Sequence, residues 1–227
     1  MKDKLNILYE DNHIIVVEKP INILSQSDNT KDIDMLSIIK SYVKEKYNKP
    51  GNVYIGLIHR LDRPTGGLMV FAKTSKAAER LSKQIIDHTF KKYYLAVIPN
   101  LKEDSGTYID YIKKESNGNA IITEEKDGKY AELSYETISK KDNLSLVKIS
   151  LLTGRHHQIR VQFSSRGYPL YGDQRYGKES KKQLALFAYK IEFSHPTTKE
   201  KLEFTLYPDY GIFNEFKEVL KWKKRTN

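Results

Sequence analysis

The stretch HRLDRPTGGLMVFAKTSKA, residues 59–77, decides how the rest of this sequence is interpreted. Asp62 stands between Arg60 and Arg63, a Pro-Thr-Gly-Gly turn follows, and the spacing predicts an apolar strand over residues 68–72. Because neighbouring positive charge favours the ionised form of a carboxyl group, Asp62 is suited to act as a charged nucleophile or electrostatic stabiliser. Taken alone, the stretch is also typical of a surface turn with a local Asp–Arg pair.

A second informative stretch is TGRHHQIRVQFSSRGYPLYGDQRYG, residues 153–177. A short helix over residues 158–164 would place Arg160 on one face with His156 and His157, where the arginine could meet a distant carboxylate. The alternative is a basic helix at the surface. We expect no metal here, because adjacent side chains on a helix diverge and no set of carboxylates accompanies the two histidines.

A third stretch, FKKYYLAV, occupies residues 90–97 and predicts a strand. Lys92 and Tyr94 would then lie on the same side of that strand. A tyrosine beside a basic residue can pack on a base while the cation holds a phosphate. The alternative for Tyr94 is an ordinary aromatic residue of the core.

Charge and composition limit the classes of function. The 227 residues contain 39 Lys and Arg against 29 Asp and Glu, a net charge of +10. This indicates a polyanionic partner, nucleic acid first and an anionic membrane surface second. The chain has no cysteine, which excludes disulfides, thiol catalysis and cysteine-bound metals. We find neither a run of about 18 apolar residues that could span a membrane nor a signal peptide, and we expect a cytoplasmic protein.

The order of the expected elements favours an α+β fold over a Rossmann-type sheet, because strands outnumber helices and do not alternate with them strictly. Turn signals between residues 107 and 152 suggest an antiparallel meander. We expect residues 1–227 to form a single catalytic domain, with two subdomains sharing one sheet as the other arrangement. The remaining expected elements are strands at 7–9, 14–18, 184–193 and 201–206, helices at 34–47 and 213–222, and a helix capped by Thr74 that buries Ala77, Leu81 and Ile85.

Together these motifs resemble the RluA family of RNA pseudouridine synthases. HRLDRPTGGLMVFAKT resembles the family's catalytic motif, and KKYYLAV resembles its Lys-x-Tyr-x-Ala strand. TGRHHQIRV with YPLYGDQRYG resembles a late motif, and LALFAYKIEFSHP resembles the closing strand motif. The opening segment IIVVEKP also fits, and all of these motifs occur in the family's order.

The resemblance implies a role for several residues. Asp62 matches the catalytic aspartate, and Arg160 matches the basic residue that pairs with it. Tyr94 matches the active-site tyrosine that contacts the target base, and Arg60 matches the arginine that fills the gap left by a flipped-out uridine. Further RNA contacts are expected from His59, Lys92 and Arg155.

The resemblance also implies a pseudouridine-synthase-type fold, with a mainly antiparallel or mixed central sheet, flanking helices and a catalytic cleft. The expected reaction breaks the N-glycosidic bond of a uridine, turns the uracil and joins its carbon to the ribose. We expect no cofactor, because neither redox chemistry nor nucleotide energy is needed. The base must leave its stack to be reached. The expected partner is ribosomal or transfer RNA, bound by a monomer without an obligate protein partner and without an appended S4-type domain.

Two positions depart from the family pattern: Gly66 stands where many members have serine, and His156 where many have threonine. Two other classes of function are open. One is a non-catalytic RNA-binding protein on the same fold. The other is a glycoside or nucleoside hydrolase, which would need a second carboxylate, and Asp173 is the candidate within the motifs. The motifs also leave open whether Asp62 attacks the sugar, attacks the base or assists proton removal.

Overall fold

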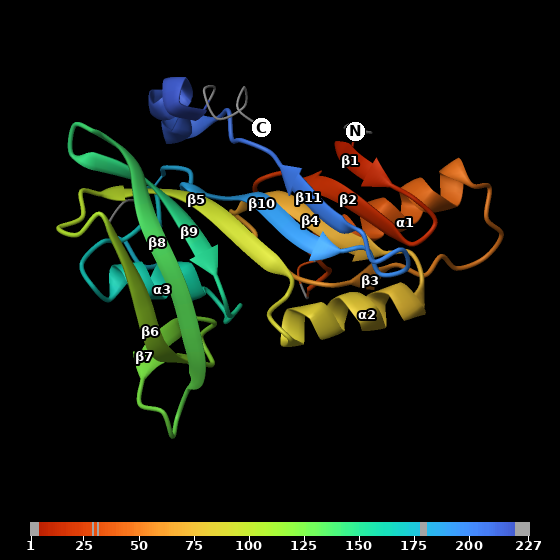
Figure 1. The fold of residues 1–227 in the computed structure, drawn as a ribbon, viewed down its shortest axis with the longest axis horizontal. Coiled ribbons are helices and arrows are strands. Elements are labelled where there is room, and N and C mark those ends of the chain that lie inside the picture. The colour runs from red at the N-terminus through yellow and green to blue at the C-terminus, as the bar shows by residue number, and fades with distance from the viewer. Residues whose placement is uncertain (1–4, 29, 31, 178–180, 221–227) are drawn as a thin grey trace. The chain divides into compact units, whose positions relative to one another are not determined.

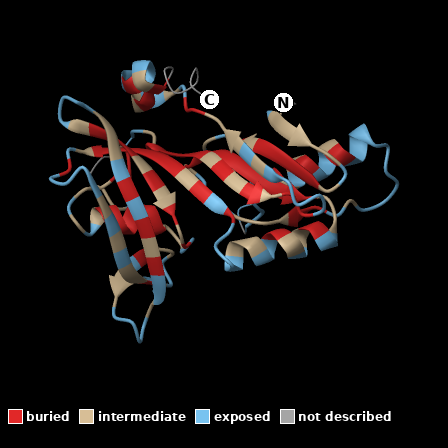
Figure 2. Cartoon of the chain, in the orientation of Figure 1, coloured by how far each residue is buried: buried red, intermediate tan, exposed pale blue. Residues whose placement is uncertain are grey.

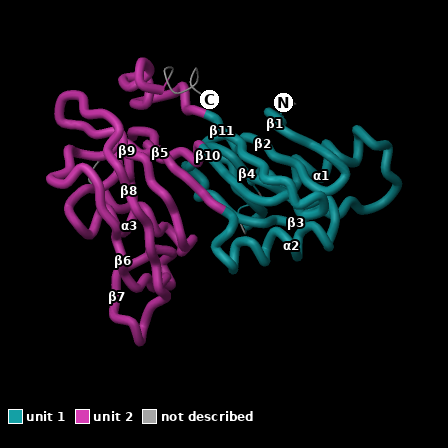
Figure 3. The backbone as a smooth tube through the Cα atoms, in the orientation of Figure 1, with its two compact units in different colours: residues 1–90, 190–206 teal, residues 91–189, 207–227 magenta. Residues whose placement is uncertain are grey.

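The computed structural model describes residues 5–28, 30, 32–177 and 181–220. The chain divides into two compact units, which Figure 3 colours separately. Unit 1 comprises residues 1–90 and 190–206, and unit 2 comprises residues 91–189 and 207–227. Each unit is described by itself below. Strands and a few helices make up both units, so the α+β prediction is confirmed (Figure 1).

The strands of unit 1 pair antiparallel. β2 pairs with β1 on one side and with β4 on the other, and β3 also pairs with β4. Lys190 to Ser194, the part of β10 that belongs to unit 1, pairs with β11. The strands are β1 (Ile7–Glu10), β2 (Ile14–Lys19), β3 (Gly56–Leu57), β4 (Gly66–Ala72), β10 (Leu186–Ser194) and β11 (Lys201–Thr205).

Two helices of unit 1 begin at the caps that their sequences favour. Asp34 caps α1 (Met35–Lys46) by accepting a hydrogen bond from the Ser37 amide at 3.0 Å. Thr74 caps α2 (Ser75–Ile86), because its hydroxyl accepts from the Ala77 amide at 3.2 Å. Both predicted helices are therefore confirmed.

The core of unit 1 lies between α2 and the strands. All seven residues of β4 are buried, as expected for a strand covered on both faces, and Figure 2 shows this strand in red. Phe90 and Phe193 stack with their ring centroids 5.0 Å apart. The buried members of this core are Ile14, Val16, Leu68, Val70, Ala72, Ala77, Leu81, Phe90, Ile191 and Phe193.

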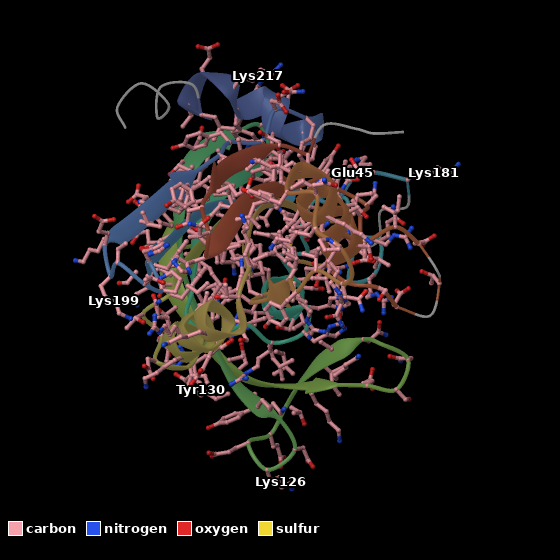
Figure 4. All side chains as sticks on the ribbon, turned by 90° about the vertical axis from the view of Figure 1, so that its right-hand side faces the viewer. Glu45, Lys126, Tyr130, Lys181, Lys199 and Lys217 are labelled. Carbon is pink, nitrogen blue, oxygen red and sulfur yellow. The ribbon has the colours of Figure 1, made fainter. Side chains whose placement is uncertain are left out.

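Unit 2 is built on a strongly curved set of antiparallel strands, in the order β5-β9-β8-β6-β7. Its elements are β5 (Lys91–Pro99), β6 (Ser105–Lys114), β7 (Ala120–Thr123), β8 (Lys129–Lys141), β9 (Leu144–Leu151), α3 (Gln158–Ser164) and the 3-10 helix η1 (Gly211–Phe216). Figure 4 shows Lys126 at the tip of the loop between β7 and β8 and Tyr130 at the start of β8.

The predicted meander is wrong in its strand order. A meander would place β7 between β6 and β8, but β8 pairs directly with β6. The first eight residues of β6 pair with β8 on one edge, and its last four pair with the short strand β7 on the other edge. Turns do lie at Asn117, Asp127 and Asp142, within the segment whose turn signals predicted the meander. Turn signals do not say which edge the next strand joins.

Helix α3 covers part of this sheet and has the predicted bounds. Val161 packs in a small core with Ile112, Ala120 and Ala131. The Phe163 ring meets Tyr108 edge-on at 5.1 Å. Six of the seven residues of α3 are buried, and Arg160 is one of them. The alternative of a basic helix at the surface is wrong.

The C-terminal helix predicted over residues 213–222 differs in form. Gly211–Phe216 is a 3-10 helix, α-helical residues follow to Leu220, and residues 221 and 222 lie outside the described residues. Within the described ranges, no helix is both long enough and apolar enough to cross a membrane.

Candidate active site

Asp62 stands on a tight turn whose backbone is held from both sides. The Asp62 carbonyl accepts a hydrogen bond from the Thr65 amide at 3.0 Å. The hydroxyl of buried Ser25 donates to the Leu61 carbonyl at 2.7 Å and accepts from the Leu61 amide at 3.0 Å. The Asp62 side chain is half-buried. The turn therefore fixes the backbone that carries the carboxylate while leaving that side chain partly accessible.

Lys19 lies beneath this turn and was missed by the sequence interpretation. Its side chain is fully buried, and Nζ donates to the carbonyls of Pro20 at 2.9 Å, Ile23 at 2.6 Å and Arg63 at 3.1 Å. Burial lowers the pKa of Lys19 to about 7, although the charge of Asp62 acts in the opposite direction. The available sequence signal was a lysine at the end of the mostly apolar strand IIVVEK.

The register of β2 against β4 places Lys19 at the start of the motif strand. Lys19 is opposite Gly67, and Val17 is opposite Met69. Gly67 has φ of 122°, a backbone conformation that favours glycine. Gly67 thus suits the backbone conformation where the Asp62 turn enters β4 beside the buried lysine.

The two arginines that flank Asp62 have separate surroundings. Arg63 forms an ion pair with Asp32 at 2.7 Å, and both side chains are about half exposed. Arg60 is exposed. Lys19, below the turn, is a further basic side chain that interacts electrostatically with Asp62.

His59 braces the motif within unit 1. Its Nε2 accepts a hydrogen bond from the Val70 amide at 3.2 Å, and its ring lies 5.5 Å from that of Phe90. The ring is half-buried. These contacts support a structural role for His59, and the expected RNA contact stays a prediction.

In unit 2, Lys92 and Tyr94 lie on the same side of β5, as their spacing predicts. Both are buried, whereas Lys91 is exposed and Tyr93 is half-buried. Tyr94 pairs in register with Ile149 of β9. The strand therefore holds the Lys-x-Tyr pair at a fixed separation along one face.

Arg160 is held by a buried carboxylate. Its Nε donates to Oδ2 of Asp173 at 2.8 Å, and Nη2 donates to Oδ1 at 2.7 Å. The amides of Arg175 and Tyr176 also donate to Oδ1 of Asp173, at 2.9 and 3.1 Å. Burial alone would raise the pKa of Asp173, but the hydrogen bonds from Arg160 and the backbone amides hold it below its usual value. Asp173 is thus a charged partner that orients Arg160.

Tyr176 forms the next layer behind Arg160. The guanidinium carbon of Arg160 lies 5.2 Å from the centroid of the Tyr176 ring. The tyrosine hydroxyl accepts from the Ala120 amide at 2.7 Å and is hydrogen-bonded to Nδ1 of His157 at 2.8 Å. This chain of contacts connects α3 to β7.

The two adjacent histidines are structural in this arrangement. His157 precedes α3 with φ of 52°, so His156 lies ahead of the helix, and the predicted shared face with Arg160 is wrong for it. The His156 Nε2 atom is 2.9 Å from the Gly118 carbonyl oxygen. Across the described parts of the chain, no group of three or more His, Cys, Asp or Glu side chains is placed to hold a metal ion.

Of the predicted site residues, Asp62, Arg60 and His59 belong to unit 1, and the others belong to unit 2. Within unit 2, Arg155 lies near enough to Lys92 for its charge to lower the pKa of that lysine. The members in unit 2 are Lys92, Tyr94, Arg155 and Arg160.

Comparison with known proteins identifies the class. Residues 13–165 match the family model described as RNA pseudouridylate synthase. An uncharacterized RNA pseudouridine synthase of Aquifex aeolicus is 32% identical, over 96% of this chain and 72% of its own length. Ribosomal large subunit pseudouridine synthase C of Vibrio vulnificus is 29% identical over 87% of this chain and 64% of its own length. The corresponding synthase D of Nitrosomonas europaea is 32% identical, over 85% and 58%.

Solved structures agree on the fold. Human RNA Pseudouridylate Synthase Domain Containing 4 superposes with a TM-score of 0.77 at 19% identity, covering 95% of this chain and 93% of that one. Human RNA Pseudouridylate Synthase Domain Containing 1 gives 0.71 at 22% identity, with 96% and 95% covered. The chain thus has the fold of these two human proteins. By the family match and the Aquifex aeolicus relative, this chain belongs to the RNA pseudouridylate synthase family.

Proposed function

We propose that this chain converts specific uridines of ribosomal RNA to pseudouridine, with Asp62 as the catalytic group. Family membership supports the reaction class. The names of two relatives, ribosomal large subunit pseudouridine synthases C and D, support ribosomal RNA as the target, ahead of transfer RNA. The motif resemblance supports the choice of Asp62.

The isomerisation needs no cofactor, because the bonds broken and formed and the protons lost and gained are equal in number. The bond between N1 of uracil and C1′ of ribose breaks, the base turns, and C5 bonds to C1′. C5 then loses its proton, and N1 gains one. A carboxylate can serve as nucleophile toward the sugar or the base, or as the group that stabilises cationic ribose and removes the proton.

One observation carries the role of Asp62. Its turn is held by Ser25 at the Leu61 backbone and by buried Lys19 at the Arg63 carbonyl, while Asp62 itself stays half-buried. A carboxylate on a turn held in this way, with a buried lysine below it, is preorganised for chemistry on a bound base. An ordinary surface turn would need neither a buried lysine nor a buried serine.

The roles of three further residues rest on the motif resemblance. Arg160 would balance the charge of Asp62, Tyr94 would contact the target base, and Arg60 would occupy the space left by the flipped uridine. We also propose RNA contacts for His59, Lys92 and Arg155. We further propose that the two units act as one catalytic domain, in a cytoplasmic monomer.

The hydrolase alternative is disfavoured by the surroundings of Asp173. A glycosidase uses a second carboxyl group as a general acid with a raised pKa or as a base toward water. Asp173 has a lowered pKa, is fully buried and accepts four hydrogen bonds. Asp173 therefore orients Arg160 and is not suited to act as a second catalytic carboxyl group.

The test uses the purified full chain with unmodified ribosomal and transfer RNA transcripts. Pseudouridine is mapped in both, and free uracil is measured. We expect discrete pseudouridines in ribosomal RNA and no free uracil. Modification confined to transfer RNA would overturn the target, and uracil release without pseudouridine would overturn the reaction.

A further inference from the structure

Lys92 is an almost fully buried lysine without an anionic partner. Its side chain is 7% exposed. Over the part of the chain that the structure describes, its ammonium forms no hydrogen bond or ion pair. Burial, with a smaller contribution from the charge of Arg155, lowers the pKa of Lys92 to about 8. A buried ammonium beside a second cation is unfavourable unless an anion compensates it.

Arg155 is fixed at its backbone and at one edge of its guanidinium. Its amide donates to Oε1 of Gln158 at 3.0 Å, and its Nε donates to the Tyr130 carbonyl at 2.7 Å. Among the described residues, neither Nη1 nor Nη2 has a hydrogen-bonding partner, and the side chain is exposed. A guanidinium held in this way can offer its terminal nitrogens to a phosphate with little loss of conformational freedom.

Gly154 keeps the approach to the ammonium open. A Cβ atom at this position would lie 3.4 Å from Nζ of Lys92, and Gly154 itself is exposed. The segment before Arg155 is rigid, because the Thr153 hydroxyl donates to Oε1 of Gln158 at 2.8 Å. Gly154 therefore borders the ammonium of Lys92 with no side chain of its own.

The neighbouring acidic side chain has its own partner. Glu132 follows Tyr130 on β8, and its carboxylate accepts a hydrogen bond from the Tyr130 hydroxyl. No ion pair joins Glu132 to Arg155 or Lys92 in the described structure. The two cations thus have no internal counter-charge.

We propose that Lys92, Gly154 and Arg155 form a binding site for one phosphate group of the RNA backbone. The identity of the anion rests on the proposed function, since RNA is the polyanion that this enzyme must hold. Two cations compensate a single phosphodiester more than fully, so one phosphate is sufficient for the site. Binding the backbone at this point would position the RNA without reading its sequence.

The first test compares Lys92→Met with Lys91→Met, a matched change at the exposed neighbour in the same strand. Methionine keeps the length of the buried side chain and removes the uncompensated charge. We expect Lys92→Met to unfold at a higher temperature than the parent chain and to bind a ribosomal RNA fragment more weakly. Lys91→Met should change neither property. A lower unfolding temperature for Lys92→Met together with unchanged affinity would overturn the proposal.

The second test counts phosphates by the salt dependence of RNA affinity. Losing one contact reduces the magnitude of the slope of log K against log salt by roughly 0.7 to 0.9. The double variant Lys92→Met with Arg155→Gln should lose about that amount, and each single variant no more. A loss of twice that amount would indicate two separate phosphates, and no loss would indicate none. Either result would overturn the shared site.

Gly154→Ala supplies a variant that leaves the charge unchanged. A methyl group 3.4 Å from Nζ should weaken RNA binding without altering the fold, because Gly154 does not have positive φ. Binding is measured without turnover, so the two proposals fail separately. If the variants show the expected salt slopes of RNA affinity but the parent converts no uridine, the proposed function alone is overturned. If the parent converts uridine normally but the salt slopes of the variants equal that of the parent, the phosphate site alone is overturned.

Discussion

Replacing Asp173 by asparagine should destabilise the protein and disorder Arg160. The substitution retains Oδ1, which accepts from Nη2 of Arg160 and from two backbone amides. It replaces Oδ2 by an amide that points its hydrogens at Nε of Arg160, now 2.8 Å from that oxygen. Both side chains are almost completely buried, with 6% and 0% exposed.

The magnitude follows from these contacts. Removing one partner of a buried ion pair costs roughly 3–5 kcal/mol, because a buried charge loses its counter-charge. Since asparagine keeps three of the four hydrogen bonds, we expect a loss near the lower limit, about 3 kcal/mol of unfolding free energy. Pseudouridine formation should fall as well, if Arg160 has its proposed role.

Urea denaturation at several pH values measures this effect. The folded-state pKa of Asp173 is lowered, so its stabilising contribution is complete above its unfolded value of about 3.9 and disappears as the pH falls through the folded value. The difference between parent and variant should thus be constant from pH 5 to 8 and shrink in acid. The matched control is Asp110→Asn, which alters a more exposed aspartate paired with Arg166 at 3.0 Å. If Asp173→Asn costs no more than this control, the buried-pair argument is refuted.

Three other changes test separate parts of the structure. Burial would raise the pKa of Glu10, but hydrogen bonds from two lysines and two tyrosines lower it to about 2. Glu10 should therefore add about 3 kcal/mol to the unfolding free energy at neutral pH, and the parent should lose this stability as the pH falls from 4.5 to 2. Glu10→Gln should be less stable at neutral pH and should not show this loss in an acid titration. Lys19→Met removes the donor to three carbonyls and should lower the unfolding free energy, measured in urea at pH 7, by at least about 3 kcal/mol. Between pH 7 and 10.5 the unfolded lysine binds more protons than the folded one, so the parent gains stability as the pH rises. The stability difference between parent and variant should therefore grow with pH. Thr74→Ala removes a helix cap and should cost about 1 kcal/mol by thermal unfolding, with no effect on uridine conversion.

Local pattern predicted most of the elements, because periodicity and capping are written in short stretches. Helix α2 begins after Thr74 as expected, α1 lies within the predicted range 34–47, and α3 has the predicted limits. Strand order was not predictable in the same way. β6 uses both of its edges, and the choice of edge depends on packing against α3 that turn residues do not reveal.

The candidate site shows the same division between local and distant information. The motif resemblance selected Asp62 and Arg160, but it did not show what supports each of them. Lys19 precedes Asp62 by 43 positions, and it reaches the turn only through the pairing of β2 with β4. Asp173 follows Arg160 by 13 positions, and its role depends on the loop that returns it to α3. Such contacts come from tertiary structure, and spacing alone does not encode them.

The most direct test of the central claim is the single-turnover rate of Asp62→Asn, read as release of tritium from RNA labelled at C5 of uridine. The matched control is Asp32→Asn, another loop aspartate, whose contact is the half-exposed ion pair with Arg63. We expect Asp62→Asn to lose roughly 10⁴-fold or more of the rate while its unfolding curve and RNA affinity stay close to those of the parent. Asp32→Asn should react nearly normally. A folded Asp62→Asn protein that still releases tritium at close to the parental rate would contradict the assignment of Asp62 as the catalytic group.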